Sequence, residues 1–331
     1  MTRVWSEGFE MKDMVGYAQT YCYADGTPRS GAASMRCLGG FLTTASLTKN
    51  ITAVSELYFR FATHMGGRET TLYFINGGTT LCTIVITRDN LISISCNGLT
   101  DTGTHTILAG YWYLIEVHIK IDNTVGVVEV KVDGLDDCDV SGDTEGAAST
   151  ITSLYLTTAY SSAAPGGTNY FDDIALNDTA GGVDDSWCGD GRIIVIKPNG
   201  DAATLDLTPS AAVDHYTLVD EVPADGDTTY VEGSVDDEED IYDLEACGLG
   251  DVIIARIWTE ARVKDTASSG KSVALITLAS GGAEVSGGDV ALTGTYTTKV
   301  LGTEELVNPV DSAAWEVADI DALQGGPRTR P

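Results

Sequence analysis

The stretch GYWYLIEVHIKIDNTVGVVEVKVDG, residues 110–134, decides the fold. In its first half Ile115, Val117 and Ile119 alternate with polar or charged residues, and after the turn at Asp122-Asn123 the second half repeats this alternation with valines. Period-2 alternation on both sides of a short turn predicts an antiparallel hairpin. One face of this hairpin is apolar and the other is wet, as expected for a sheet that packs on a second sheet.

The same pattern recurs outward from this hairpin in both directions. Further strands are indicated by SELYFRFATH (55–64), TTLYFING (70–77), TTLCTIVITRDNLISISCNG (79–98), STITSLYLTTA (149–159) and NYFDDIALND (169–178). Roughly eight strands with turns every ~8–12 residues predict a β-sandwich or jelly roll.

The rest of the chain also looks all-β, with short strands after about residue 185. The exception is DSAAWEVADIDALQGG (311–326), where Ser312 is a suitable N-cap and Gly325 a suitable stop for one short helix. A chain of 331 residues is long enough for two domains. We therefore expect a jelly-roll domain over 1–182, a linker and connecting strand over 183–213, and a second, smaller β-sandwich-like domain over 214–331.

The charge balance disfavours nucleic acids and anionic membranes as binding partners. With 49 acidic and 19 basic residues the formal net charge is −30, which repels nucleic acid and anionic membrane surfaces. No apolar run approaches the ~18 residues that membrane insertion needs. The first residues, MTRVWSEGFE, lack the apolar core of a signal peptide, so we expect synthesis in a cytoplasm.

Cysteine and histidine patterns predict no metal centre. The seven cysteines are odd in number and contain no CxxC pair, and the four histidines are dispersed. We expect the cysteines to be small buried hydrophobic residues in a reducing compartment. Zinc binding is disfavoured because tetrahedral sites need clustered ligands.

Catalytic motifs are also missing. The sequence contains no GxSxG, no phosphate-binding loop and no HExxH. A retaining glycoside hydrolase needs two acids about 5 Å apart on one strand face, and Glu116 has no such second acid. Asp172 and Asp173 are adjacent and would point to opposite faces of a strand. We therefore predict that the chain is not an enzyme.

The acids of GTNYFDDIALND (167–178) leave two interpretations open. Asp172 and Asp173 either orient and terminate a strand by accepting backbone hydrogen bonds, or help to bind calcium, the only cofactor that this chemistry suggests. The acidic run DDEED (236–240) indicates a solvated loop ahead of a strand, because it lacks the ligand spacing of a calcium loop.

Several motifs together resemble a known superfamily. WSEGFE (5–10), LYFRF (57–61), the hairpin at 110–134 and YFDDIALND (170–178) resemble the concanavalin A-like lectin/glucanase superfamily, in the form found in tailed-phage virion proteins. In addition, residues 255–282 and AWEVADIDALQGG (314–326) are similar to a β-rich module of phage structural proteins. The resemblance implies a jelly-roll sandwich over about residues 4–180.

This resemblance implies a structural protein of a bacteriophage virion, as a capsid decoration, a head-fibre component or a tail-associated protein. Its partners would be other virion proteins and further copies of itself in a homo-oligomer. Such contacts need aromatic residues at exposed positions. The candidates for these assembly contacts are Trp5, Phe9, Tyr17, Tyr21 and Tyr23.

The alternative is a carbohydrate-binding adhesin on the virion surface, with a host surface glycan as its partner. Aromatic rings stack on sugar faces, while Asn and Asp hydrogen-bond hydroxyls. Tyr111, Trp112 and Tyr113, with Asp172 and Asp173, are the candidates for this site. A glycoside hydrolase is a second, less favoured alternative, and Glu116→Gln would test it.

Overall fold

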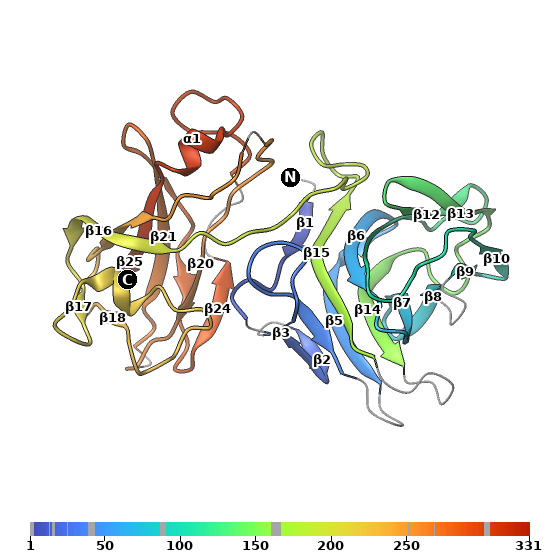
Figure 1. The fold of residues 1–331 in the computed structure, drawn as a ribbon, viewed down its shortest axis with the longest axis horizontal. Coiled ribbons are helices and arrows are strands. Elements are labelled where there is room, and N and C mark those ends of the chain that lie inside the picture. The colour runs from blue at the N-terminus through green and yellow to red at the C-terminus, as the bar shows by residue number, and fades with distance from the viewer. Residues whose placement is uncertain are drawn as a thin grey trace. The chain divides into compact units, whose positions relative to one another are not determined.

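The computed structural model describes residues 3–12, 14, 17–24, 26–38, 44–86, 91–159, 167–250, 252–267, 269–300 and 305–331, and for 297–300 it describes the backbone alone. The chain forms two compact units, Met1–Ile194 and Val195–Pro331. Both consist almost entirely of antiparallel strands (Figure 1). The described part of the chain contains no helix that is long and apolar enough to cross a membrane.

The larger sheet of the first unit has eight strands. They are β1 (Arg3–Glu7), β3 (Cys22–Ala24), β4 (Met35–Cys37), β6 (Glu56–His64), β11 (Trp112–Lys120), β12 (Gly126–Val132), β13 (Leu135–Gly142) and β15 (Asn169–Asp178). Their order is β13-β12-β11-β6-β15-β4-β3, and β1 pairs with β15. The last strand of the unit therefore lies inside the sheet and not at its edge.

A seven-stranded sheet forms the second layer of this unit. Its strands are β2 (Ala18–Thr20), β5 (Ala45–Val54), β7 (Glu69–Asn76), β8 (Thr79–Ile86), β9 (Ile92–Cys96), β10 (Leu99–Thr102) and β14 (Ile151–Ala159). Their order is β10-β9-β8-β7-β14-β5-β2. The two sheets enclose one core, to which each contributes alternate residues, such as Phe59 and Phe61 from β6 and Leu72 and Phe74 from β7.

The hairpin on which the fold prediction rests is confirmed. Strands β11 and β12 pair antiparallel, with Val117 opposite Val130 and Ile119 opposite Val128, and all four side chains are buried in the core. Burying an aliphatic side chain of this size stabilises the fold by about 1.5–3 kcal/mol. The predicted β-sandwich of jelly-roll type is therefore present in the first unit.

The second unit is built on a smaller six-stranded sheet. Its elements are β16 (Pro198–Leu205), β17 (Thr208–Pro209), the 3₁₀ helix η1 (His215–Leu218), β18 (Val231–Glu232), β19 (Asp240–Leu244), β20 (Glu260–Val263), β21 (Ser272–Ala279), β22 (Ala283–Ser286), β23 (Val290–Ala291), β24 (Thr297–Val300), α1 (Val317–Ile320) and β25 (Gln324–Arg330). The sheet runs β16-β19-β25-β21-β22, with β23 beside β21, while β17-β18 and β20-β24 form two-stranded sheets.

Several local expectations differ from the structure of this unit. Residues 183–194, expected within the linker and connecting strand, belong to the first unit, and Pro198–Leu205, in the same expected range, forms strand β16 of the second unit. His215–Leu218 lies in a part of the chain expected to hold short strands, and it forms the 3₁₀ helix η1. These segments are short and mostly half-buried, so no long apolar period marks them.

The expected helix over 311–326 is real but far shorter. It is the single turn α1, and its cap is a capping box between Glu316 and Asp319, not Ser312. The helix ends at Ile320, well before the expected stop at Gly325. Gly325 instead lies in strand β25 (Gln324–Arg330), between β19 and β21. Trp315, Ile320 and Leu323 are buried together, as expected for residues that dock on the sheet.

The acidic run 236–240 is more than a solvated loop. Asp236, Asp237 and Glu239 form ion pairs with Lys271, Arg330 and Arg328, three basic residues of the neighbouring segment and strand. Asp240 is fully buried and accepts hydrogen bonds from the Leu207 amide, the His215 ring and the Tyr242 hydroxyl. This carboxylate therefore holds three separate segments of the second unit together.

Candidate functional site

Five side chains form a row across the outer face of the eight-stranded sheet. The cross-strand register places Trp112 opposite His64, His64 opposite Tyr170, Tyr170 opposite Arg36 and Arg36 opposite Tyr23. Their neighbours along the strands face the core, so period-2 alternation points these five outward. We call this set, which crosses β11, β6, β15, β4 and β3, the aromatic row.

The side chains of the aromatic row contact one another. The His64 ring lies 5.6 Å from the Trp112 ring and 5.5 Å from the Tyr170 ring, both edge to face. At the other end of the row the Arg36 guanidinium lies 5.8 Å from the centre of the Tyr23 ring. Edge-to-face pairs and cation–π contacts are favourable and fix the orientation of rings.

The aromatic row combines apolar faces with polar atoms. Four of its members are half-buried and Tyr23 is exposed. The Nδ1 atom of His64 has no hydrogen-bond partner among the described residues. Alternate strands lie about 10 Å apart, so Trp112, Tyr170 and Tyr23 space three rings evenly along the face. Rings with polar groups between them are the chemistry that sugars require.

The three aromatic residues that the sequence suggests for sugar binding do not lie on one face of the sheet. Trp112 belongs to the aromatic row, whereas Tyr113 packs against the core and its hydroxyl bonds to the Leu108 amide. Tyr111 precedes the strand and is 63% exposed. Successive residues of a strand point to opposite faces, so a run of three aromatics cannot line one surface.

Asp172 and Asp173 hold a loop onto the sheet. Asp172 accepts hydrogen bonds from the Arg29 and Ser30 amides at 2.8 and 3.3 Å. Asp173 accepts from the Arg29 guanidinium, the Ser30 hydroxyl and the Ile193 amide at 3.0, 2.6 and 2.8 Å. Both carboxylates are fully buried and surrounded by donors. This arrangement fits the interpretation in which the acids orient the strand.

The two carboxylates reach the same loop, which strict alternation would not allow. Asp173 has a positive φ of 50°, and the register of β15 against β6 shifts between Asp172 and Ala175. A bulge of this kind inserts an extra residue and redirects the side chains. The expectation that the two acids point to opposite faces therefore differs from the structure.

Burial changes the acidity of two carboxyls in this region. Desolvation, reinforced by the neighbouring charge of Asp173, raises the pKa of Asp172 to about 8. Desolvation also raises the pKa of Glu10 to about 7, although the Ala32 amide hydrogen-bonds to this carboxyl. The described residues contain no group of three or more potential metal ligands. Calcium binding at Asp172 and Asp173 stays a prediction.

Residues 185–193 cover another part of the outer face of the eight-stranded sheet. Trp187 packs on the Tyr58 and His118 rings, and the Lys131 ammonium lies 4.3 Å from the Trp187 ring. Glu116, the acid considered for hydrolysis, is buried and accepts a hydrogen bond from the Gly189 amide. Among the described residues, the contacts of this segment named here involve no member of the aromatic row.

The residues suggested for assembly contacts divide into two groups. Phe9 is fully buried and Trp5 is 7% exposed, and Tyr17 packs against them in the core. These three side chains stabilise the sandwich and are not at the exposed positions that an assembly contact needs. Tyr21 and Tyr23 are 46% and 45% exposed, so both remain available on the surface.

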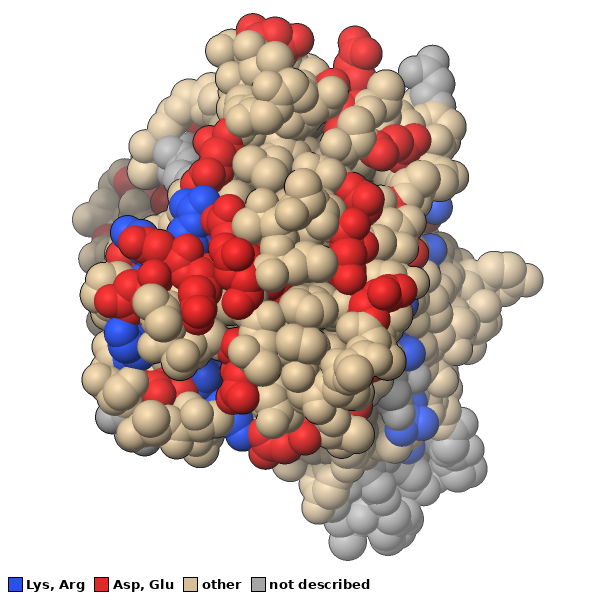
Figure 2. All heavy atoms as spheres, turned by 90° about the vertical axis from the view of Figure 1, so that its left-hand side faces the viewer, with Lys and Arg blue, Asp and Glu red and all other residues tan. Residues whose placement is uncertain are grey.

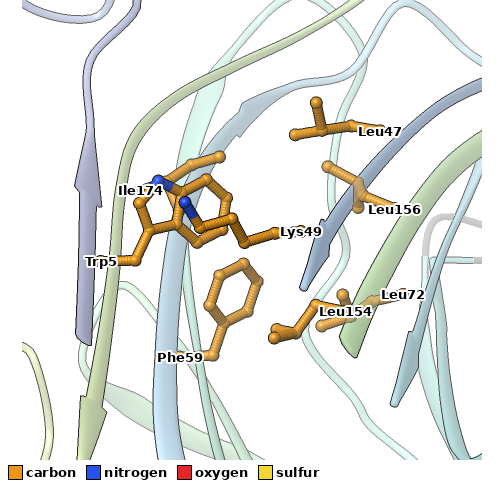
Figure 3. A pocket seen from close by; sticks show the side chains of 8 residues that line it. All are labelled: Trp5, Leu47, Lys49, Phe59, Leu72, Leu154, Leu156 and Ile174. Atoms are coloured by element: carbon orange, nitrogen blue, oxygen red, sulfur yellow. The ribbon is translucent and has the colours of Figure 1, made fainter. Parts of the chain in front are cut away.

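The space between the two sheets is too small to be a ligand site. Figure 3 shows its lining, in which the Lys49 side chain enters from β5 among Trp5, Phe59, Ile174 and four leucines. Its volume of about 10 Å³ would hold one water molecule at most. The Lys49 ammonium lies over the Trp5 ring, and burial lowers its pKa.

The outer face of the seven-stranded sheet differs in chemistry and provides a comparison surface. Tyr73 and Tyr155 are register partners, with ring centres 5.6 Å apart. The positions around them carry hydroxyls, namely Thr48, Thr71, Thr83, Ser93, Ser95 and Thr157. Among the described residues, this face has two central rings but no cation–π or histidine contact like those of the aromatic row.

Known proteins resemble this chain in fold alone. No family model and no curated protein matches it. A sialidase structure matches 54% of the chain and 19% of its own length, at 13% identity and a TM-score of 0.43. The alginate lyase Aly36B matches 52% of this chain and 96% of its own length, at 13% identity and a TM-score of 0.36. The seed lectin of Lotus tetragonolobus matches 52% of this chain and 97% of its own length, at 8% identity and a TM-score of 0.37.

Further structural neighbours are a tetrameric galectin from the sponge Cinachyrella, at 12% identity and a TM-score of 0.33, and the carbohydrate recognition domain of Emp46p, at 10% identity and a TM-score of 0.38. At such identities they assign no role to any residue of this chain. The aromatic row was missed in the sequence because its members lie up to 147 positions apart, between Tyr23 and Tyr170. Only the register of four strand pairs brings them together, and alternation alone does not give that register.

Proposed function

We propose that the first unit is a carbohydrate-binding module and that the aromatic row is its glycan site. The observation that carries the proposal is the placement of Trp112, Tyr170 and Tyr23 on alternate strands, with His64 and Arg36 between them. Rings bind the apolar faces of sugars, while the imidazole and guanidinium supply hydrogen bonds to hydroxyl or carboxylate groups. This corresponds to an adhesin, in which binding and not turnover is the activity.

A glycan array probed with the full chain tests this proposal, with neutral and acidic glycans as separate arms. Trp112→Ala should weaken binding by about tenfold, a loss of about 1.4 kcal/mol. Tyr155→Ala is the matched control, because it removes a half-buried ring from the opposite sheet and should leave binding unchanged. Circular dichroism of both variants checks that they are folded.

Two results would count against the aromatic row as the site. One is full binding by Trp112→Ala, and the other is an equal loss in Trp112→Ala and Tyr155→Ala. A preference for acidic over neutral glycans would follow from the positive charge of Arg36. That preference should disappear in Arg36→Gln, while binding to neutral glycans should persist.

As a second candidate we infer a structural role in a tailed-phage virion, through contacts with other virion proteins or with further copies of this chain. The observation that favours it is the exposure of Tyr21 and Tyr23 at the edge strand β3. Exposed aromatics beside a sheet edge suit protein–protein contacts. Sedimentation of the full chain should show an oligomer that Tyr21→Ser weakens, and co-purification with particles would identify its partner.

A further inference from the structure

Four of the seven cysteines form two opposed pairs, which their spacing in the sequence does not suggest. Cys22 of β3 is the register partner of Cys37 of β4, and Cys82 of β8 is the register partner of Cys96 of β9. Each of the four is only 1–2% exposed. Both pairs lie on the core side of their sheets.

The geometry of both pairs is compatible with a disulfide. Residues directly opposite in an antiparallel ladder have Cα atoms about 4.5–5.5 Å apart, which falls inside the range of about 4.4–6.8 Å that disulfides span. The Sγ atoms of Cys22 and Cys37 are already 2.8 Å apart. No backbone movement is therefore needed to bring the sulfurs of this pair within reach.

The thiols of the second pair also contact each other. A hydrogen bond with Cys96 raises the pKa of the Cys82 thiol, and the same bond lowers the pKa of Cys96. In the first pair, burial and contact with Cys22 raise the pKa of Cys37.

The other three cysteines lack such a partner, which makes them internal controls. Cys138 lies opposite Val130 in the register of β12 and β13. The Cys188 sulfur lies 3.7 Å from the carbonyl oxygens of Tyr58 and Ala175. Cys247 is in the second unit, where its amide donates to Asp321.

We propose that Cys22–Cys37 and Cys82–Cys96 are two oxidation sites that close to cross-strand disulfides when the protein meets a small-molecule disulfide such as oxidised glutathione. This proposal is independent of the glycan site. It replaces the expectation of seven inert buried thiols for these four residues; of the other three, Cys138 is buried as expected, whereas Cys188 and Cys247 are half-buried.

The chemistry is two successive thiol–disulfide exchanges for each pair. One cysteine thiolate attacks a sulfur of oxidised glutathione, which forms a mixed disulfide and releases one glutathione thiolate. The partner thiolate then attacks the mixed disulfide at the cysteine sulfur and releases the second glutathione. The pair loses two electrons, glutathione disulfide gains them, and the two cysteine protons end on the two released glutathione molecules.

Access to the buried sulfurs differs between the pairs. Strand β3 is a three-residue strand at the edge of its sheet, so the first pair becomes accessible when this strand detaches. The second pair is separated from its edge by β10, whose pairing with β9 must open first. We therefore expect Cys22–Cys37 to close before Cys82–Cys96 in the native protein.

The test uses refolding, so that burial of the sulfurs in the folded protein cannot prevent the reaction. The full chain is refolded from denaturant in a buffer of reduced and oxidised glutathione, free thiols are blocked with N-ethylmaleimide, and mass and peptide maps are recorded. We expect three blocked cysteines, Cys138, Cys188 and Cys247, and two linked peptide pairs. The oxidised chain should melt roughly 5–10 °C above the reduced chain.

Matched variants assign each link. Cys37→Ala should abolish the Cys22 link, keep the Cys82–Cys96 link and lower the gain in melting temperature. Cys138→Ala should keep both links and the full gain. Seven blocked cysteines after refolding, or links that involve Cys138, Cys188 or Cys247, would overturn the proposal. If the refolded chain contains only one of the two expected disulfides, the proposal is wrong for the other pair.

Discussion

At the scale of single residues, buried carboxylates organise both units. Asp173 joins the bulge of β15 to the loop at Arg29 and to the Ile193 amide. Asp240 does the same in the second unit for Leu207 and His215. A buried carboxylate is tolerated only where donors surround it. These two residues carry a structural role that a sequence shows only as an acid in a strand.

The raised pKa of Glu10 predicts a pH dependence of stability. Its pKa is about 7 in the folded protein against 4.5 for the free side chain, so the folded state binds the proton more tightly. The contribution of Glu10 to the free energy of unfolding should therefore fall as pH rises from about 4.5 to 7, by at most about 1.4 kcal/mol per pH unit. Urea unfolding curves at several pH values measure this slope.

Asp172 extends the same trend toward pH 8, because its pKa is raised from 3.8 to about 8. Glu10→Gln should reduce the slope between about pH 5 and 7 but not abolish it, because the contribution of Asp172 spans about pH 4 to 8. An identical slope in Glu10→Gln and the parent chain would contradict the assignment to Glu10.

Replacement of Asp240 should destabilise the second unit selectively. Asp240→Ala leaves the Leu207 amide, the His215 ring and the Tyr242 hydroxyl without their acceptor, which should cost about 3 kcal/mol or more. Calorimetry should show a lower transition for the second unit and an unchanged one for the first. Asp243→Ala, which removes an exposed acid three residues on, should change neither.

At the scale of elements, the sequence predicted the strands of the first unit well and those of the second unit only in part. Long period-2 runs such as 110–134 mark strands because one face is buried and the other is not. Strand β16 and helix η1 lie where burial is partial, so their side chains carry no such period. The aromatic row depends on pairing between strands, which a single sequence does not encode in an obvious form.

The covering segment 185–193 provides a prediction at this scale. Trp187 stacks against Tyr58 and His118, and Arg60 donates to the carbonyl oxygen of Gly189. Trp187→Ala should loosen the segment and speed tryptic cleavage after the exposed Arg192 severalfold. Time-resolved gels with mass spectrometry measure the rate. Tyr73→Ala is the control, and a rate unchanged in Trp187→Ala would refute the role of this ring.

At the scale of the whole molecule, negative charge dominates. The second unit holds 26 of the 49 acidic residues and only eight of the 19 basic ones. Figure 2 shows acidic side chains spread over the face of the molecule that it presents. Charges of one sign repel one another across a folded surface and favour its expansion. The ion pairs of Arg328 and Arg330 offset only part of this repulsion.

Salt should therefore stabilise the protein. A rise in NaCl from about 10 to 150 mM shortens the Debye length from about 30 to 8 Å and should raise the melting temperature by a few degrees. Differential scanning fluorimetry measures the melting temperature, and a sample with an equal osmolarity of sucrose is the control. A melting temperature that falls with salt would show that the ion pairs, and not the repulsion, dominate.

The central place of β15 has a consequence for synthesis. This strand pairs with β6, β4 and β1, yet it comprises residues 169–178 and is the last strand of its unit to be made. On the ribosome, a nascent chain holds β6 and β1 with unsatisfied edges until this strand emerges. At about 5–20 residues per second, that wait lasts several seconds or more. The first unit should thus depend on chaperones during translation, and a pause placed just before codon 169 should increase its aggregation.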